Sequence, residues 1–338
     1  MMRKPVSSPS SADRDRGAAL ATVLVMVAVM SMIAVGVVEA ARFSIQRTDN
    51  QAQMDQSHWF LLGAEAYATS RIDRALEQSA ADRASLSEWV GRTITLPLDE
   101  GSMFITISDG GNCFNLNSLV QQNEGGPLVA SEAGVARFSR LLSILGVPSS
   151  RTLAASLADW IDADNVPGLG GAEDGAYGGS QAVYLPANQL LGDTSELRSI
   201  QGFDGGVISR LAGLACVRPT AAANAIGVNT LRPDQAPLLS AIFGPGLPLA
   251  SAETVIRDRP KGGWPDLDSF FSDPRLAPIE LSAESRSMFT LVSRWYVIGV
   301  RVHFADTVET SVALVDTASG HGRIVRRVFG APTTNGVL

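Results

Sequence analysis

The sequence has few of the residues, and none of the short motifs, that usually carry catalysis. It contains three histidines and two cysteines in 338 residues, and it lacks the HExxH, GxSxG, P-loop and GxGxxG patterns. His58, His303 and His321 have no chemical partner beside them in the sequence. We therefore expect a protein that is not an enzyme, with a hydrolase built from distant residues as the alternative.

Charge and proline are also missing from the N-terminal part. No charged residue occurs between Ala18 and Val38, and no proline occurs from Ala18 to Ala80. A helix of about 20 apolar residues spans the hydrocarbon core of a bilayer. The sequence therefore predicts a membrane-spanning helix that continues into the soluble part of the protein.

The charges before this apolar run predict its orientation. Cations outnumber anions there, with Arg3, Lys4, Arg14 and Arg16 against Asp13 and Asp15. Positive residues before a span favour a cytoplasmic N-terminus, so we expect an inner-membrane protein with one span and its globular part in the periplasm. Because the whole chain has a net charge of −7, we expect no general affinity for nucleic acid or other polyanions.

Both cysteines lie in the part predicted to face an oxidising compartment. Cys113 and Cys216 are expected there either to form one disulfide or to stay two separate buried thiols. A bridge that closes a loop of about 100 residues would stabilise the fold by a few kcal/mol on the chain-entropy argument.

Hydrophobic patterns at both ends of the chain predict antiparallel strands. Residues 93–96 and 103–107 alternate apolar and polar side chains around a turn at 99–101, which is typical of a β-hairpin. Further β-rich runs occur near the C-terminus, at 295–302, 308–315 and 324–329. These runs follow a long helix, so the ends of the chain predict a helix packed on a sheet.

The middle of the chain has a different composition. It is rich in Ala, Leu, Pro and Gly and contains short helical patterns, such as 135–145 and 153–161. We therefore predict an α+β protein with a large mainly helical domain inserted over 113–290. The helix-plus-sheet domain would then consist of residues 40–112 and 291–338.

The N-terminal sequence RGAALATVLVMVAVMSMIAVGVVEA resembles a type IV prepilin leader junction. In such proteins a membrane prepilin peptidase cuts after the glycine, and the new N-terminus is methylated. The resemblance implies cleavage between Gly17 and Ala18, a leader over 1–17 and a transmembrane part over 18–39. A secretory signal is cut after its apolar run, whereas Gly17 precedes the run, so the helix is expected to stay. An ordinary single-pass anchor is the alternative.

Thr22 is the fifth residue after this junction, where most pilins and pseudopilins carry a glutamate. In lacking that carboxylate, the chain is similar to the K-class minor pseudopilins of type II secretion systems. Strings in the family's order extend the resemblance through the chain: CFNLN, LADWIDAD, GGAEDGAY, YLPANQLL, SELRSIQGF and VNTLRP. On these residues the sequence is identified as a member of the K class, which implies a pilin-like long helix on an antiparallel sheet with a large helical insertion.

Membership of the K class implies a structural role. It predicts a subunit at the tip of the type II secretion pseudopilus that helps to initiate assembly and to export folded proteins across the outer membrane. The implied partners are the minor pseudopilins of the I and J classes. The helix face that contains Phe43, Met54, Trp59 and Phe60 is the expected partner surface, although part of it must pack on the subunit's own sheet.

An acidic loop suggests a metal site. No lysine or arginine occurs between Arg151 and Arg198, whereas seven carboxylates do. Calcium binds about six to eight oxygens in flexible geometry, and the lack of neighbouring histidine and thiol ligands disfavours zinc. K-class pseudopilins bind calcium, so the resemblance implies that this loop carries ligands, and the candidates are Asp162, Asp164, Glu173 and Asp174.

The spacing of these residues does not make an EF-hand, because Val166 and Pro167 stand where that motif needs an oxygen ligand and a glycine. We expect the preceding helix to end near Pro167 and Gly168. A solvated acidic loop is the alternative to a metal site. In that case Asp159 faces water, and Asp193 and Glu196 only cap the next helix.

Residues 228–271 resemble a helix-hairpin-helix unit, with a glycine turn at 244–246. A membrane-anchored DNA receptor is therefore the alternative function. Nucleic-acid affinity requires clustered cations, whereas the cations of this segment are balanced by acidic residues. We expect a structural helical unit rather than a DNA-binding one.

Overall fold

A computed structural model describes residues 11–77, 89–122, 125–178 and 184–330, with side chains from residue 18 onward. The first ten residues of the predicted leader and the side chains of the rest of it lie outside this description. The chain divides into a unit up to His58 and a unit from Trp59 onward, and each is treated by itself.

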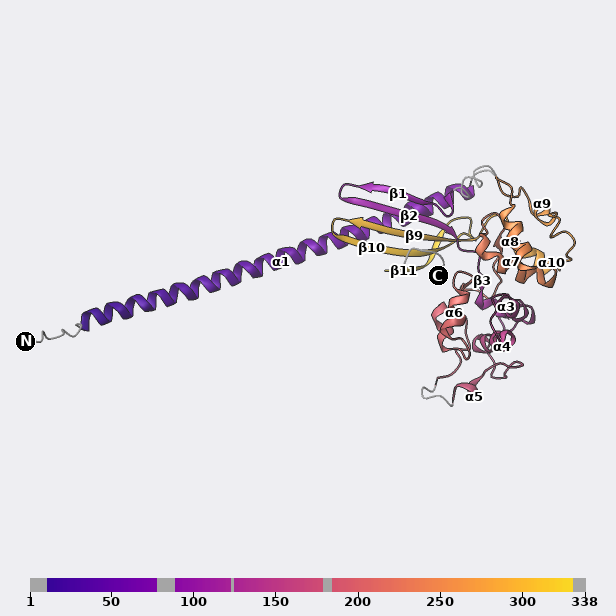
Figure 1. Cartoon of the computed structure of the whole chain (residues 1–338), viewed down its shortest axis with the longest axis horizontal. Coiled ribbons are helices and arrows are strands. Elements are labelled where there is room, and N and C mark those ends of the chain that lie inside the picture. Colours follow the sequence, from indigo (N-terminus) through magenta and orange to yellow (C-terminus); the bar gives the residue numbers. More distant parts are fainter. Residues whose placement is uncertain (1–10, 78–88, 123–124, 179–183, 331–338) are drawn as a thin grey trace, which may run out of the picture. The chain divides into compact units, whose positions relative to one another are not determined.

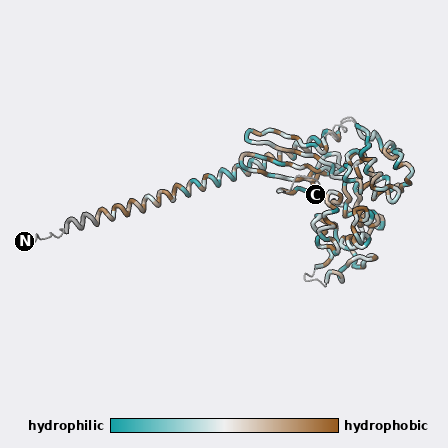
Figure 2. Tube along the Cα trace, in the orientation of Figure 1, coloured by the Kyte–Doolittle hydropathy of each residue, from teal (hydrophilic) through white to brown (hydrophobic). Residues whose placement is uncertain are grey.

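The first unit is the N-terminal part of helix α1, which extends over Ser11–Glu77 (Figure 1). The absence of proline allows this length, since proline removes a helical hydrogen bond and clashes with the preceding turn. Figure 2 shows its first described part as apolar and the part that follows as increasingly hydrophilic. The side chains from Ala18 to Ala52 are all exposed.

The last turns of α1 pack on a sheet within the second unit. Buried residues recur there every three or four positions: Leu61, Ala64, Ala68, Ile72 and Ala75. This spacing places them on one helix face, and the three alanines among them let the helix approach the sheet closely. They form one core with the inward side chains of the strands, including Ile105, Ile298 and Val300.

The sheet has five antiparallel strands in the order β1-β2-β9-β10-β11. Their bounds are Thr93–Leu98, Gly101–Asp109, Trp295–Phe304, Thr307–Asp316 and Arg323–Phe329. Figure 1 shows strands from both ends of the chain side by side, as the pairing of β2 with β9 requires. The hairpin and the three C-terminal strands predicted from sequence are thus confirmed.

Between β2 and β9 lies a mainly helical region with its own hydrophobic core. Its α-helices are α3 (Glu132–Ile144), α4 (Ser150–Ile161), α5 (Asp174–Tyr177), α6 (Gly205–Leu211), α7 (Ala236–Phe243), α8 (Leu249–Arg257), α9 (Leu267–Phe271) and α10 (Ala283–Ser287). Short 3-10 helices are η1 (Leu116–Leu119), η2 (Thr194–Ser199), η3 (Pro233–Gln235) and η4 (Gly244–Gly246). Short strands form three two-stranded pairs: β3 (Phe114–Asn115) with β6 (Ala215–Cys216), β4 (Val120–Gln122) with β5 (Leu128–Ala130), and β7 (Ile226–Gly227) with β8 (Phe289–Thr290).

This arrangement confirms the predicted α+β fold with a long N-terminal helix, an antiparallel sheet and a helical insertion. One boundary was predicted wrongly. Helix α4 ends at Ile161, about two turns before the expected end near Pro167. The N–H of Ala163 donates to the carbonyl of Leu128 in β5 instead of to a carbonyl of its own helix. The helical hydrogen-bond pattern therefore stops before Ala163.

Candidate functional site

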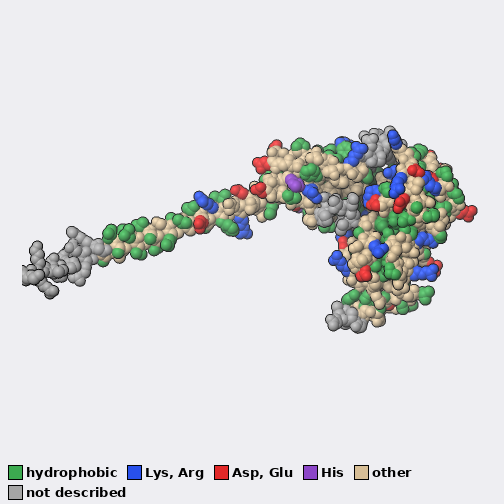
Figure 3. All heavy atoms as spheres, in the orientation of Figure 1, with side chains coloured by type: hydrophobic (Ala, Val, Ile, Leu, Met, Phe, Trp, Pro, Cys, Tyr) green, Lys and Arg blue, Asp and Glu red, His purple; other side chains and the backbone are tan. Residues whose placement is uncertain are grey.

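The apolar part of α1, from Ala18 to Val38, contains no carboxylate that could pair with a neighbouring subunit. Among the described residues, one helix is long and apolar enough to cross a membrane, and its described stretch starts at Ala18. Figure 3 shows hydrophobic side chains covering this stretch, with charged ones farther along the helix. The Thr22 hydroxyl donates to the carbonyl of Ala19 at 2.8 Å. Thr22 is therefore satisfied within its own helix.

Three of the four residues expected on the partner surface are exposed. Phe43, Met54 and Trp59 are each more than half exposed, whereas the ring of Phe60 lies edge-on to Phe304 of β9 with centroids 5.2 Å apart. Phe60 thus packs on the subunit's own sheet, as was expected of part of this face. The exposed residues leave apolar area for a lipid or protein partner.

The acidic loop brings three of the four predicted ligands together. Asp162 follows the end of α4, Asp164 is two residues later, and Glu173 is the residue before α5. One carboxylate oxygen from each lies within 4.8 Å of the others. Asp174 is outside this group, and its carboxylate accepts a hydrogen bond from Asn165 at 3.1 Å.

The electrostatics of this cluster are unfavourable without a counter-ion. Asp162 and Glu173 are buried, and Asp162 Oδ1 and both carboxylate oxygens of Glu173 have no hydrogen-bond partner in the described part of the chain. Burial, followed by the charges of Asp164 and Asp159, raises the pKa of Asp162 to about 7. Burial and the neighbouring carboxylates likewise raise the pKa of Glu173 to about 7. A cation would remove this repulsion.

Asp159 does not face water, which corrects the sequence-based alternative. It is 2% exposed, and its carboxylate accepts from the N–H of Gly168 at 3.1 Å. Gly171 passes so close that a Cβ there would lie 1.8 Å from Asp159 Oδ2. Asp159 therefore shapes the loop between Asp164 and Glu173. The only sequence signal for this contact was the run of glycines in the loop.

Asp193 and Glu196 cap the next helix, as the alternative interpretation of the acidic loop expected. The Asp193 side chain accepts from the N–H of Ser195, and Glu196 accepts from the N–H of Asp193, which together make a capping box for η2. These two carboxylates are therefore not part of the acidic cluster. Asp193 also pairs with Arg326 of the sheet.

The helix-hairpin-helix-like segment has the predicted form, with η4 between α7 and α8. Its three arginines bond within the segment: Arg232 to Asp234, Arg257 to Glu253, and Arg259 to the carbonyls of Val228 and Leu231. Arginines that are used in this way do not form a phosphate-binding cluster. The geometry therefore does not favour the DNA-receptor alternative.

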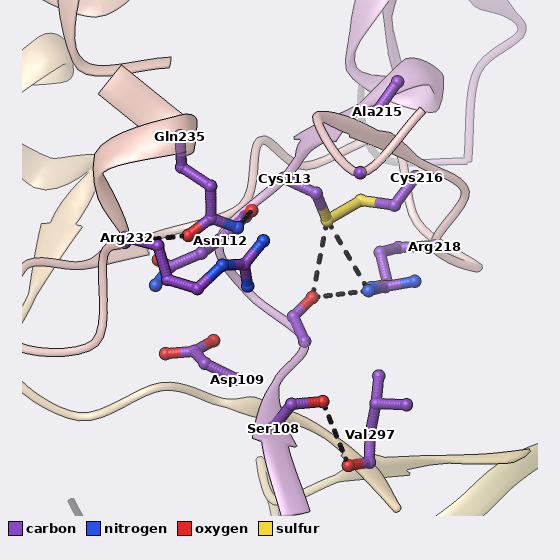
Figure 4. A pocket seen from close by; sticks show the side chains of 12 residues that line it. Ser108, Asp109, Asn112, Cys113, Ala215, Cys216, Arg218, Arg232, Gln235 and Val297 are labelled. Atoms are coloured by element: carbon purple, nitrogen blue, oxygen red, sulfur yellow. Dashed lines mark hydrogen bonds between the residues drawn. A yellow bond between two sulfur atoms is a disulfide. The ribbon is translucent and has the colours of Figure 1, made fainter. Parts of the chain in front are cut away.

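A buried joint connects β2 to the insertion (Figure 4). A disulfide joins Cys113 to Cys216, and both residues line a pocket with Asp109 and Arg218. Arg218 is 1% exposed, and its guanidinium donates to the carbonyls of Gly110 and Val217 and contacts the Cys113 sulfur. Burial and the charge of Arg326 lower its pKa to about 10, so it stays protonated at neutral pH.

Comparison with known proteins decides the family. Two sequence models described as type II secretion system protein K match residues 112–220 and 226–291, which fall in the region between β2 and β9. Type II secretion system protein K of Pectobacterium carotovorum subsp. carotovorum is 32% identical over 325 residues, covering 95% of this chain and 98% of that protein. The chain belongs to the type II secretion system protein K family.

Other relatives agree with this assignment. The protein K of Klebsiella pneumoniae is 34% identical over 273 residues, covering 80% of this chain and 83% of that protein. A chain in the crystal structure of the GspK-GspI-GspJ complex from enterotoxigenic Escherichia coli superposes with a TM-score of 0.71 at 26% identity. The superposition covers 85% of this chain and all of that one. The K-class identification made from the sequence is thereby confirmed.

Proposed function

We propose that this member of the protein K family is a minor pseudopilin that assembles with the I- and J-class minor pseudopilins. The observation that carries the proposal is the similarity to the whole of one chain of the GspK-GspI-GspJ complex. The exposed apolar residues Phe43, Met54 and Trp59 of α1 supply a surface for such partners. The role is structural, because the family is a component of the secretion machinery.

The helix anchors the subunit in the inner membrane with the globular part in the periplasm. Prepilin peptidase cuts between Gly17 and Ala18, and the new N-terminal amine is methylated. This orientation is supported by the excess of cations before the apolar run. The apolar length of the helix supports retention in the membrane after the cut.

The subunit occupies the tip of the pseudopilus, where it helps to initiate assembly and to export folded proteins across the outer membrane. A subunit with nothing above it needs no carboxylate to pair with a neighbour's N-terminus, and a charged side chain in the bilayer centre costs about 2.5–3.5 kcal/mol on insertion scales. The Thr22 hydroxyl bonds within its own helix, which agrees with that position. The large insertion also fits a tip better than a repeating shaft.

The acidic loop binds calcium through Asp162, Asp164 and Glu173, with Asp174 beside them. The residues fit a hard cation because buried carboxylate oxygens lack donors in the described structure and three ligand atoms lie close together. Calcium supplies positive charge that offsets the repulsion among these carboxylates. The ligands themselves are held by the end of α4, the start of α5 and the packing of Asp159 against Gly171.

Co-purification tests the proposed assembly. The full chain is co-expressed with the I- and J-class pseudopilins of the same secretion system, extracted in detergent and isolated through a tag on the J-class subunit. We expect one complex that contains all three proteins. The substitution Trp59→Asp should weaken it, whereas Val308→Asp on β10, where the side chain is also more than half exposed, should not. Absence of this chain from the material that elutes with the tagged J-class subunit in the wild-type experiment would contradict the proposal.

A further inference from the structure

The segment that follows the acidic loop contacts it through Asn188. Asn188 has a left-handed backbone with a φ of 46°, a conformation that asparagine adopts more readily than most other residues. Its backbone N–H donates to the carbonyl of Trp160 at 3.1 Å, and its Nδ2 donates to Oδ1 of Asn165 at 3.1 Å. Asn165 directly follows Asp164, one of the clustered carboxylates. These two hydrogen bonds connect Asn188 to the end of α4 and to the acidic loop.

A few residues later the same segment is held by the body of the insertion. The buried amide of Asn117 accepts from the N–H of Leu191 at 2.8 Å and donates to the Leu191 carbonyl at 3.0 Å. The Glu196 carboxylate accepts from the N–H groups of Gly192 and Asp193 at 2.7 and 3.0 Å. Residues 188–193 are thus held by hydrogen bonds at both ends, at Asn188 beside the candidate cation site and at residues 191–193.

Arg326 of β11 binds the far end of this segment from the sheet. Its guanidinium donates to the carbonyl of Gly192 at 3.2 Å and forms an ion pair with Asp193. The next residue of the strand, Arg327, pairs with the buried Glu65 of α1 at 2.7 Å. Successive strand side chains point to opposite faces. Two neighbouring arginines therefore connect the 188–193 segment on one face of the sheet with helix α1 on the other.

We propose that the 188–193 segment and Arg326 couple cation binding in the acidic loop to the rigidity of β11 and of the sheet that supports α1. This inference rests on the proposed calcium site. With the ion bound, Asp164 and Asn165 are fixed, so Asn188 and the acceptors for Arg326 stay in place. Without it, repulsion among the carboxylates loosens the loop and the segment. Because binding linkage is reciprocal, loss of the Arg326 contact must weaken calcium binding.

Calorimetric calcium titration of the full chain in detergent tests the coupling. The substitution Arg326→Gln should raise the Kd for calcium about fivefold or more, within the usual range for coupled sites. Arg323→Gln is the matched control, because Arg323 is an exposed residue of the same strand. Asn188→Gly is a second variant that keeps the left-handed backbone and removes the amide, and it should raise the Kd similarly. Amide exchange of β11 should slow on addition of calcium in the wild type and not in Arg326→Gln.

The outcomes separate the coupling from the metal site. If the wild type binds calcium and both Arg326→Gln and Asn188→Gly bind it with the wild-type Kd, the coupling is wrong while the calcium site stands. If the wild type does not bind calcium, the site itself is wrong and the coupling fails with it. An equal rise in the Kd for calcium in Arg323→Gln would also overturn the inference, because removal of any positive charge from β11 would then explain the effect.

Discussion

The ion pair between Glu65 and Arg327 gives a quantitative test of how α1 is fixed to the sheet. Glu65 is 1% exposed in the middle of the helix–sheet interface. One carboxylate oxygen accepts from Arg327 Nε at 2.7 Å, and the other accepts from the buried hydroxyl of Ser311 at 2.6 Å. Arg327 is about a third exposed, with 34% of its side-chain surface accessible. The two partners are therefore not equivalent.

This difference in burial predicts which substitution lowers the free energy of unfolding more. Arg327→Met leaves a carboxylate buried with one hydroxyl partner, and removing one member of a buried pair costs about 3–5 kcal/mol. Glu65→Gln keeps an acceptor for Ser311, and the arginine can turn towards solvent, so the cost should be about 1–2 kcal/mol. The double variant should recover most of the loss in Arg327→Met, because no buried charge remains.

Urea and thermal unfolding of the detergent-extracted protein measure these differences. At roughly 2–4 °C per kcal/mol for a domain of this size, Arg327→Met should lower the melting temperature by roughly 6–20 °C. The double-mutant cycle then gives the coupling energy between the two side chains. The reasoning is refuted if Glu65→Gln costs as much as Arg327→Met, or if the double variant is no more stable than Arg327→Met alone.

Three further predictions concern the insertion. Glu173→Gln should weaken calcium binding at least tenfold by removing a ligand charge, as measured by calorimetry, and an unchanged Kd would exclude Glu173 as a ligand. Gly171→Ala should destabilise the protein by about 1–3 kcal/mol, because its Cβ meets Asp159, whereas Gly175→Ala, which has open space, should cost much less in the same urea assay. Although partial burial alone would raise the pKa of Asp193, hydrogen bonds from Ser195 and Arg326 lower it from 3.8 to about 2. The stability that it contributes is thus present above about pH 4 and lost towards pH 2, so the difference in urea midpoint between the wild type and Asp193→Asn should shrink over that interval; a constant difference would contradict this.

Local patterns in the sequence were sufficient for the elements of the fold. The alternation over 93–107 and the β-rich runs within 295–329 predicted strands, and the absence of proline predicted the long helix. The class of the protein followed from the glycine before the apolar run, Thr22 and the strings that resemble the K class. Strand and helix patterns depend on residues close together in the sequence, and the family motifs can be recognised directly in it.

Contacts between distant residues were not predictable in the same way. The end of α4 depends on a hydrogen bond from Ala163 to Leu128 in a short strand. The burial of Asp159 depends on the close approach of Gly171. The pair of Arg326 and Asp193 joins the sheet to the insertion, and no spacing rule relates residues so far apart in the chain.

Mass analysis of the N-terminus of the membrane-extracted protein tests the central claim most directly. If the chain is a processed pseudopilin, it should begin at Ala18 with a methylated amine and retain the apolar segment that follows. A chain that keeps residues 1–17, or one that has lost the whole segment from Ala18 to Val38, would contradict the account.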